Sequence, residues 1–257
     1  MFKTIFFASP LEQFQIIPLF ILKFGFFDFS ITNATLILGL VFFLFFSFIF
    51  IILNKNNTLH IIPTKGQAVI ELIYKLILAL VVDNIKDKRG QKFFPFVFSL
   101  FLFIVLLNLI GLIPYSFTLT SHLIVTLALS LSVFIGINII CVRIHGIHFF
   151  SLFLPPGTSI LLAFLLVPIE LISYIFKPIS LSIRLFANMM AGHTLLKVIA
   201  GFAAVLMTKT GILFLLHYVP LLILIPLFGL ELGVALIQAF VASILICIYL
   251  NDAISLH

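Results

Sequence analysis

The residues of this sequence that can do chemistry lie inside long apolar runs. In the run from about 158 to 208, Glu170, Lys177 and Arg184 recur every seven residues, so on a helix they would share one stripe. A guanidinium group at bilayer depth costs at least about 2.5–3.5 kcal/mol. It cannot relay protons because it never loses its charge, but it can attract a carboxylate and block protons. Alternatively, the Arg184 side chain snorkels to the membrane surface or forms an internal ion pair with Glu231, and neither has a role in ion transfer.

A second polar stripe follows in the last apolar run, about 219 to 250. Glu231 and Gln238 are seven residues apart, and Asp252 lies fourteen residues further on. Glu231 and His193 can both bind and release protons near neutral pH. A fixed positive charge among titratable groups indicates a gate between two proton paths. Since no other internal carboxylate lies near the middle of a run, a carboxylate on another subunit is an attractive partner for Arg184.

The composition places these residues in a membrane. The chain has 257 residues, of which 63% are hydrophobic and only 9% charged, whereas soluble proteins carry about 25% charged residues. Several apolar runs exceed the roughly 20 residues that cross a bilayer as a helix, and strands of a β-barrel would instead alternate polar and apolar residues. We therefore predict an all-α polytopic membrane protein. Its two cysteines fall in apolar runs and are expected to be buried.

We expect one membrane domain over residues 1–257, with about five membrane-embedded helices and one amphipathic surface helix. Its predicted parts are a lead-in at 1–32, a first span at 33–53, the surface helix at 64–92, two spans within 93–142 and a helical hairpin at 158–257. Each run of the hairpin is too long for one upright span, so it is broken or steeply tilted. Thr32 or Asn33 is expected to cap the first span.

The distribution of Lys and Arg predicts the orientation. Segment 54–92 holds seven of them, segment 114–121 none and segment 143–157 one. The positive-inside rule puts 54–92 on the inner side and the N-terminus outside. Because the basic residues gather between spans, the net charge of +6 does not indicate nucleic-acid binding.

Three segments resemble a known family. KPISLSIRLFANMMAGH, LELGVALIQAFVASILICIYLNDA and FIVLLNLIGLIP are similar to segments of subunit a of the F-type ATP synthase, and the resemblance covers the chain from about residue 60 onward. It implies the stator half of a proton turbine. The fifth and sixth helices of that family form a steeply inclined hairpin against a rotating ring of c subunits.

The resemblance implies roles for the polar residues of the hairpin. Arg184 matches the essential arginine that meets each ring carboxylate and prevents a proton short circuit, and Gln238 matches the glutamine opposite it. His193 and Glu231 match a paired position in the outer half-channel. Bacterial members commonly carry these two residue types in the reverse order, so we predict that the two side chains touch. Their order here is that of mitochondrial members.

The other matched positions have less specific roles. Asn188 is expected to line the channel region near Arg184, and Glu170 and Asp252 the inner half-channel. We expect Lys177 to be structural or to face lipid. Asn108 would either line the channel or form an interhelical hydrogen bond.

The resemblance implies the c-ring, the peripheral stalk, other membrane-sector subunits, lipids and transported protons as partners. The membrane would be the mitochondrial inner membrane, with the N-terminus in the intermembrane space and 54–92 on the matrix side. We expect no cofactor or metal: His145 and His148 have no carboxylate or cysteine beside them, and His122, His217 and His257 are expected to be solvated. The motif GxxxxGK[ST] is absent, so ATP chemistry belongs to other subunits.

Three alternatives compete with this interpretation. An ion-coupled secondary transporter would also bury charges, but such folds usually carry internal repeats, and none is visible. A purely structural subunit of a respiratory complex would leave the stripes unexplained. Sodium coupling is disfavoured by the histidine, since imidazole is a poor ligand for Na⁺.

Overall fold

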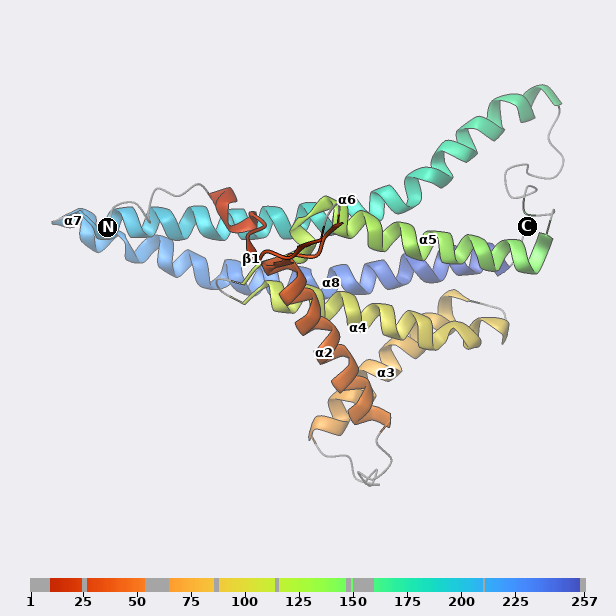
Figure 1. The fold of residues 1–257 in the computed structure, drawn as a ribbon, viewed down its shortest axis with the longest axis horizontal. Helices are drawn as coiled ribbons and strands as arrows, with labels where there is room; N and C mark the ends of the chain where they lie inside the picture. The colour runs from red at the N-terminus through yellow and green to blue at the C-terminus, as the bar shows by residue number, and fades with distance from the viewer. Residues whose placement is uncertain are drawn as a thin grey trace. The chain divides into compact units, whose positions relative to one another are not determined.

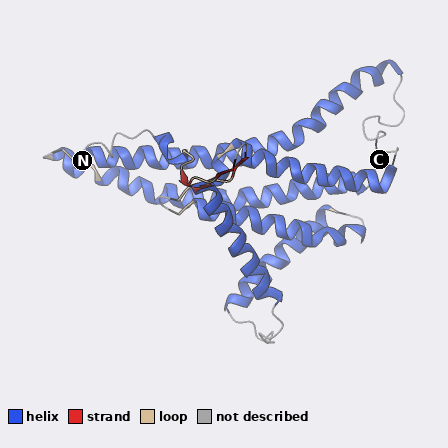
Figure 2. Cartoon of the chain, in the orientation of Figure 1, coloured by secondary structure: helices blue, strands red, loops and turns tan. Residues whose placement is uncertain are grey.

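The computed structural model describes residues 10–24, 27–53, 65–85, 88–113, 116–146, 149, 160–209 and 211–254, and it is helical over most of them (Figures 1 and 2). Five of the described helices are long and apolar enough to cross a membrane. The predicted all-α polytopic class is therefore confirmed. Two small antiparallel strand pairs, drawn red in Figure 2, occur in the lead-in, where the sequence analysis predicted no strands.

The described part of the lead-in starts with η1 (Pro10–Phe14) and continues into four short strands. β1 (Pro18–Phe20) pairs with β4 (Ile31–Thr32), and β2 (Lys23–Phe24) pairs with β3 (Phe27–Asp28).

The first long helix, α2 (Asn33–Leu53), starts at the predicted cap. The backbone N–H of Thr35 donates to Thr32 Oγ1 at 3.3 Å, and the N–H of Thr32 donates to Thr35 Oγ1 at 2.9 Å. This reciprocal pair satisfies an N–H of the first turn of the helix. Asn33 Nδ2 donates to the carbonyl oxygen of Gln15 at 3.0 Å, which ties the lead-in to the helix.

The predicted surface helix is α3 (Lys65–Asn84), followed by η2 (Lys88–Phe93). Ile77 and Val81 are buried, whereas Val69 and Leu72 are exposed. Tyr74 packs edge-on against Phe94, with the ring centroids 4.8 Å apart. Within the helix, Gln67 Nε2 donates to Glu71 Oε1 at 3.0 Å.

Two spans follow, α4 (Phe94–Gly111) and α5 (Leu123–His145), with η3 (Leu119–Ser121) between them. The hairpin consists of α6 (Ile160–Met207), the short α7 (Ile212–Leu216) and α8 (Tyr218–Ile254). α6 is one continuous helix of 48 residues, despite two internal prolines, Pro168 and Pro178 (Figure 1). Its length of about 72 Å exceeds a bilayer core of about 30 Å. A break therefore does not explain its length, and inclination in the membrane stays the prediction.

The contacts of the chain divide it into two compact units whose limits fall inside helices. The first unit comprises residues 1–47, 104–125 and 185–238, and the second comprises 48–103, 126–184 and 239–257. A small core of the first unit joins Leu112, Met189 and Ala235. The larger core of the second unit draws on α3, α4, α5 and α8, and includes Ile77, Val81, Val97, Val133, Ile137, Ile246 and Leu250. That the two units form one membrane domain stays a prediction.

Both cysteines are buried and free, as predicted: Cys141 is 1% exposed and Cys247 is 0% exposed. The native chain is therefore a suitable background for thiol labelling.

We predict that Lys75→Cys reacts with a membrane-impermeant maleimide only from the inner side and Leu11→Cys only from the outer side. Both positions are exposed, and α2 separates them along the chain. Labelling of sealed vesicles of each orientation measures this, with the native chain as the unlabelled control. Reaction of both variants from one side would show that α2 does not cross the membrane.

Candidate functional site

The predicted site residues fall into both units. His193, Glu231, Asn188, Asn108 and Gln238 belong to the first unit. The second unit holds the remaining ionisable residues of the site, Glu170, Lys177, Arg184 and Asp252.

His193 of α6 and Glu231 of α8 lie side by side. His193 Nε2 is 3.6 Å from Glu231 Oε1, so the predicted contact is confirmed. The side chains are 14% and 5% exposed, and neither His193 Nε2 nor either carboxylate oxygen has a hydrogen-bond partner among the described residues. A small approach, or one bridging water, would bring the two groups within reach for proton transfer.

Gly192 makes this arrangement possible. A Cβ at this position would lie 2.6 Å from Glu231 Oε1 and 2.9 Å from Glu231 Cδ. Real Cβ atoms essentially never come so close, so a side chain here would displace the carboxylate. The sequence analysis did not identify Gly192, although it lies within the quoted MMAGH stretch.

Asn108 of α4 is 0% exposed and contacts α8. Its Nδ2 donates to the carbonyl oxygen of Ala235 at 3.1 Å, which confirms the predicted interhelical hydrogen bond. Ala235 lies one helical turn from Glu231 and three residues before Gln238. Asn108 Oδ1 is buried without a partner within the described chain. This oxygen is therefore available as an acceptor for the other predicted role of Asn108, in the channel.

Arg184 lies half-buried on α6. Two residues earlier, the Ser182 hydroxyl lies 3.0 Å from the Thr126 hydroxyl of α5, and both side chains are buried. This contact fixes the stretch of α6 that carries Arg184. Among the described residues of the second unit, no carboxylate forms an ion pair with Arg184. Gln238 and Asn188 are half-buried on α8 and α6.

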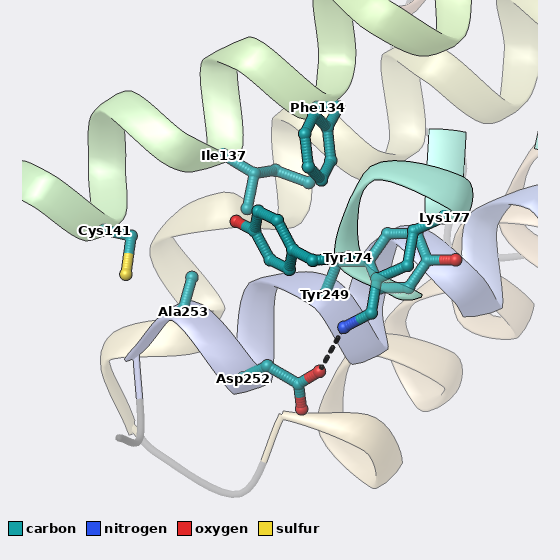
Figure 3. A pocket seen from close by; sticks show the side chains of 8 residues that line it. All are labelled: Phe134, Ile137, Cys141, Tyr174, Lys177, Tyr249, Asp252 and Ala253. Atoms are coloured by element: carbon teal, nitrogen blue, oxygen red, sulfur yellow. Dashed lines mark hydrogen bonds and ion pairs between the residues drawn. The ribbon is translucent and has the colours of Figure 1, made fainter. Parts of the chain in front are cut away.

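Lys177 of α6 does not face only lipid. Its Nζ lies 3.4 Å from Asp252 Oδ2 of α8, next to the rings of Tyr174 and Tyr249 (Figure 3). Lys177 was expected to be structural or to face lipid, and this contact agrees with the structural role. Glu170 is half-buried and does not line this pocket.

Two histidines contradict the prediction that they are solvated. His122 Nε2 is buried without a hydrogen-bond partner in the described chain, and the ring stacks on Phe117 with centroids 5.0 Å apart. This burial lowers the pKa of His122 below its ordinary value. His217 is 4% exposed, packs against Tyr218 and contacts the carbonyl oxygen of Phe214. Both rings fold onto aromatic neighbours close to them in sequence.

His145 ends α5 and contacts the end of α8. Its Nε2 lies 3.1 Å from the carbonyl oxygens of both Ala253 and Ile254. The imidazole therefore contacts carbonyl groups at the C-terminal end of α8, which have no hydrogen-bond donor within the helix. His148 and His257 lie outside the described residues.

Comparison with known proteins decides the family. The family described as ATP synthase A chain matches residues 35–251. The chain belongs to this family. It is 57% identical to ATP synthase subunit a of Pylaiella littoralis, over 98% of this chain and 100% of that protein. It is 50% identical to ATP synthase subunit a of Marchantia polymorpha, over 97% and 99%, and 47% identical to that of Chondrus crispus, over 97% of each.

Membership of this family establishes a membrane subunit of the F-type ATP synthase, which works in a complex with other subunits of that enzyme. It argues against the independent carrier and the respiratory-complex subunit. The resemblance to subunit a that the sequence motifs indicated is thereby confirmed.

We predict that Gly192→Ala lowers ATP-driven proton pumping about tenfold or more, because misplacing a reacting group by 1 Å costs on the order of 100-fold. The matched control is Gly201→Ala on the same helix, where a Cβ would meet nothing within 4 Å. Alanine is the better helix former by about 0.8–1.0 kcal/mol, so neither change weakens α6 itself. Equal pumping by the two variants, in vesicles with equal amounts of assembled complex, would show that the close approach of Gly192 to Glu231 is not needed for pumping.

Proposed function

We propose that this chain is the proton-conducting stator subunit of the ATP synthase. It forms two offset aqueous half-channels that pass protons to and from carboxylates on the rotor c-ring, and so couples proton translocation to rotation and ATP synthesis. The observation that carries the proposal is the buried pair of His193 and Glu231. Their nearest polar atoms are 3.6 Å apart, and His193 Nε2 and both Glu231 oxygens have no hydrogen-bond partner among the described residues.

A purely structural role does not account for this pair. A buried polar group without a hydrogen bond costs roughly 1–3 kcal/mol, and the pair holds three such atoms. A proton relay needs acceptors of this kind, because an acceptor takes up a passing proton through a lone pair that no other donor occupies. We assign His193 and Glu231 to the outer half-channel, with Asn188 lining the channel near Arg184.

Arg184 supplies the barrier in the proposal. Its guanidinium group keeps its charge and has no carboxylate partner among the described residues of its unit. Each ring carboxylate would lose its proton on meeting this charge, because a nearby cation favours the ionised form. Gln238 supports Arg184, and Glu170 and Asp252 line the inner half-channel.

The proposed partners are the c-ring, the peripheral stalk and other membrane-sector subunits. We place the chain in the mitochondrial inner membrane, with the N-terminus in the intermembrane space. The order of His193 and Glu231 and the closing IYLNDA support the mitochondrial assignment, and the basic residues of 54–92 support the orientation.

Arg184→Ala should leave the complex assembled but reduce ATP-driven acidification of vesicles to background. The matched control is Arg143→Ala, which removes an exposed arginine at the end of α5 and should pump normally. Fluorescence quenching of a pH-sensitive dye measures the pumping. Normal pumping by the Arg184→Ala complex would refute the proposed barrier.

The double change His193→Glu with Glu231→His should retain more pumping than either single change. The two side chains face each other across one contact, so exchanging them restores one imidazole and one carboxylate. Pumping rates per assembled complex test this for all three variants. If the double variant pumps no faster than the slower of the two single variants, the pair does not act as a relay.

A further inference from the structure

The second unit contains a charged cluster formed by side chains of α6 and α8 (Figure 3). Lys177 Nζ lies 3.4 Å from Asp252 Oδ2, 5.3 Å from the ring centroid of Tyr174 and 5.1 Å from that of Tyr249. The ammonium group therefore has a carboxylate and two aromatic rings around it. Each of these neighbours attracts a cation.

The cluster is anchored to a third helix. The Tyr174 hydroxyl donates a hydrogen bond to Asn138 Oδ1 of α5, and its ring packs on Phe134 at 4.9 Å between centroids. Tyr174 is thus held from α5 while its ring faces Lys177 of its own helix. Three helices therefore fix the position of one ammonium group.

The charged pair borders a small cavity. It is lined by Lys177, Asp252, Tyr174, Tyr249, Cys141 and three apolar side chains. About 10 Å³ is open to the centre of a water molecule, which is room for about one water. Lys177 contacts Oδ2 of the carboxylate. The Asp252 side chain as a whole is 46% exposed, so the carboxylate is not enclosed by the protein.

Stability alone is a weak reason for this arrangement. The two side chains are 27% and 46% exposed, and ion pairs of this exposure contribute little to the stability of a fold. The effect of the ion pair is geometric. Lys177 and the rings of Tyr174 and Tyr249, which we call the clamp, restrict where the Asp252 carboxylate can point. A proton acceptor is effective only within hydrogen-bond reach of its donor or of one bridging water.

We propose that Lys177 is a positioning residue of the inner half-channel, which with the rings of Tyr174 and Tyr249 holds the Asp252 carboxylate beside a one-water cavity. This inference rests on the proposed function, since it assigns Asp252 a part in proton release. It predicts that Lys177 acts through Asp252 and not by itself.

The test is a double-mutant cycle in the assembled complex, reconstituted in liposomes with the pH of each side set separately. Lys177→Met and Asp252→Asn should each reduce pumping about tenfold, and the double variant should be no slower than Asp252→Asn alone, since coupled residues are not additive. Lys177→Arg should retain more pumping than Lys177→Met, because arginine keeps a positive charge that can pair with the carboxylate and lie over the aromatic rings. Lys197→Met, on the same helix in the first unit, is the matched control.

A second readout separates positioning from simple packing. Lys177→Met should change the dependence of pumping on inner-side pH and leave the dependence on outer-side pH unchanged. Among the described residues that line the cavity, the other titratable groups are Lys177 and Tyr174 of α6, Tyr249 of α8 and Cys141 of α5. If Lys177→Met prevents assembly, Tyr249→Leu and Tyr249→Phe replace it, since only the first removes the ring.

The outcomes distinguish this inference from the function on which it rests. Additive losses in the cycle, an unchanged inner-side pH profile or equal pumping by Tyr249→Leu and Tyr249→Phe would overturn the clamp. If Arg184→Ala still abolishes pumping in the same preparation, the proposed function survives that result. Normal pumping by Arg184→Ala would instead overturn the function itself.

Discussion

The need to place one permanent positive charge in an apolar membrane segment dominates this structure. A guanidinium group at bilayer depth costs at least about 2.5–3.5 kcal/mol, and no carboxylate of its own unit pairs with Arg184 among the described residues. The helix that carries it is continuous over 48 residues and is held by a buried hydroxyl contact two residues before the arginine. Such a rigid and unpaired charge suits a partner carboxylate that another subunit brings and removes.

The two carboxylates of α8 lie in contrasting environments. Glu231 is buried beside a histidine, with no hydrogen bond to either oxygen from the described residues. Asp252 is half-exposed, with Lys177 Nζ 3.4 Å from its Oδ2. A carboxylate beside a histidine has a partner with which it can exchange a proton, whereas a carboxylate beside a lysine is held in place by an ion pair. Such a difference fits proton uptake and proton release by separate paths, as the proposed function requires.

Apolar periodicity and length predicted the helices well, because a segment that crosses a bilayer must satisfy its backbone internally. The contact of His193 with Glu231 was also predictable, from the exchange of residue types within the family. Gly192 was not, because its close approach to Glu231 depends on how two helices rotate against each other. A polar stripe names a helix face but not the register between helices, so the pairing of Lys177 with Asp252, 75 residues apart, was also missed. His122 and His217 were misjudged because local turns bury their rings.

The most direct test of the central claim is an electron cryomicroscopy map of the detergent-extracted complex at side-chain detail. The account predicts that the carboxylate nearest to the Arg184 guanidinium group belongs to a small helical-hairpin subunit of the rotor ring. It also predicts that Glu231 stays with His193 in that map. A map in which Arg184 forms an ion pair with Glu231 or Glu170 of its own chain, with no ring carboxylate near it, would contradict the account.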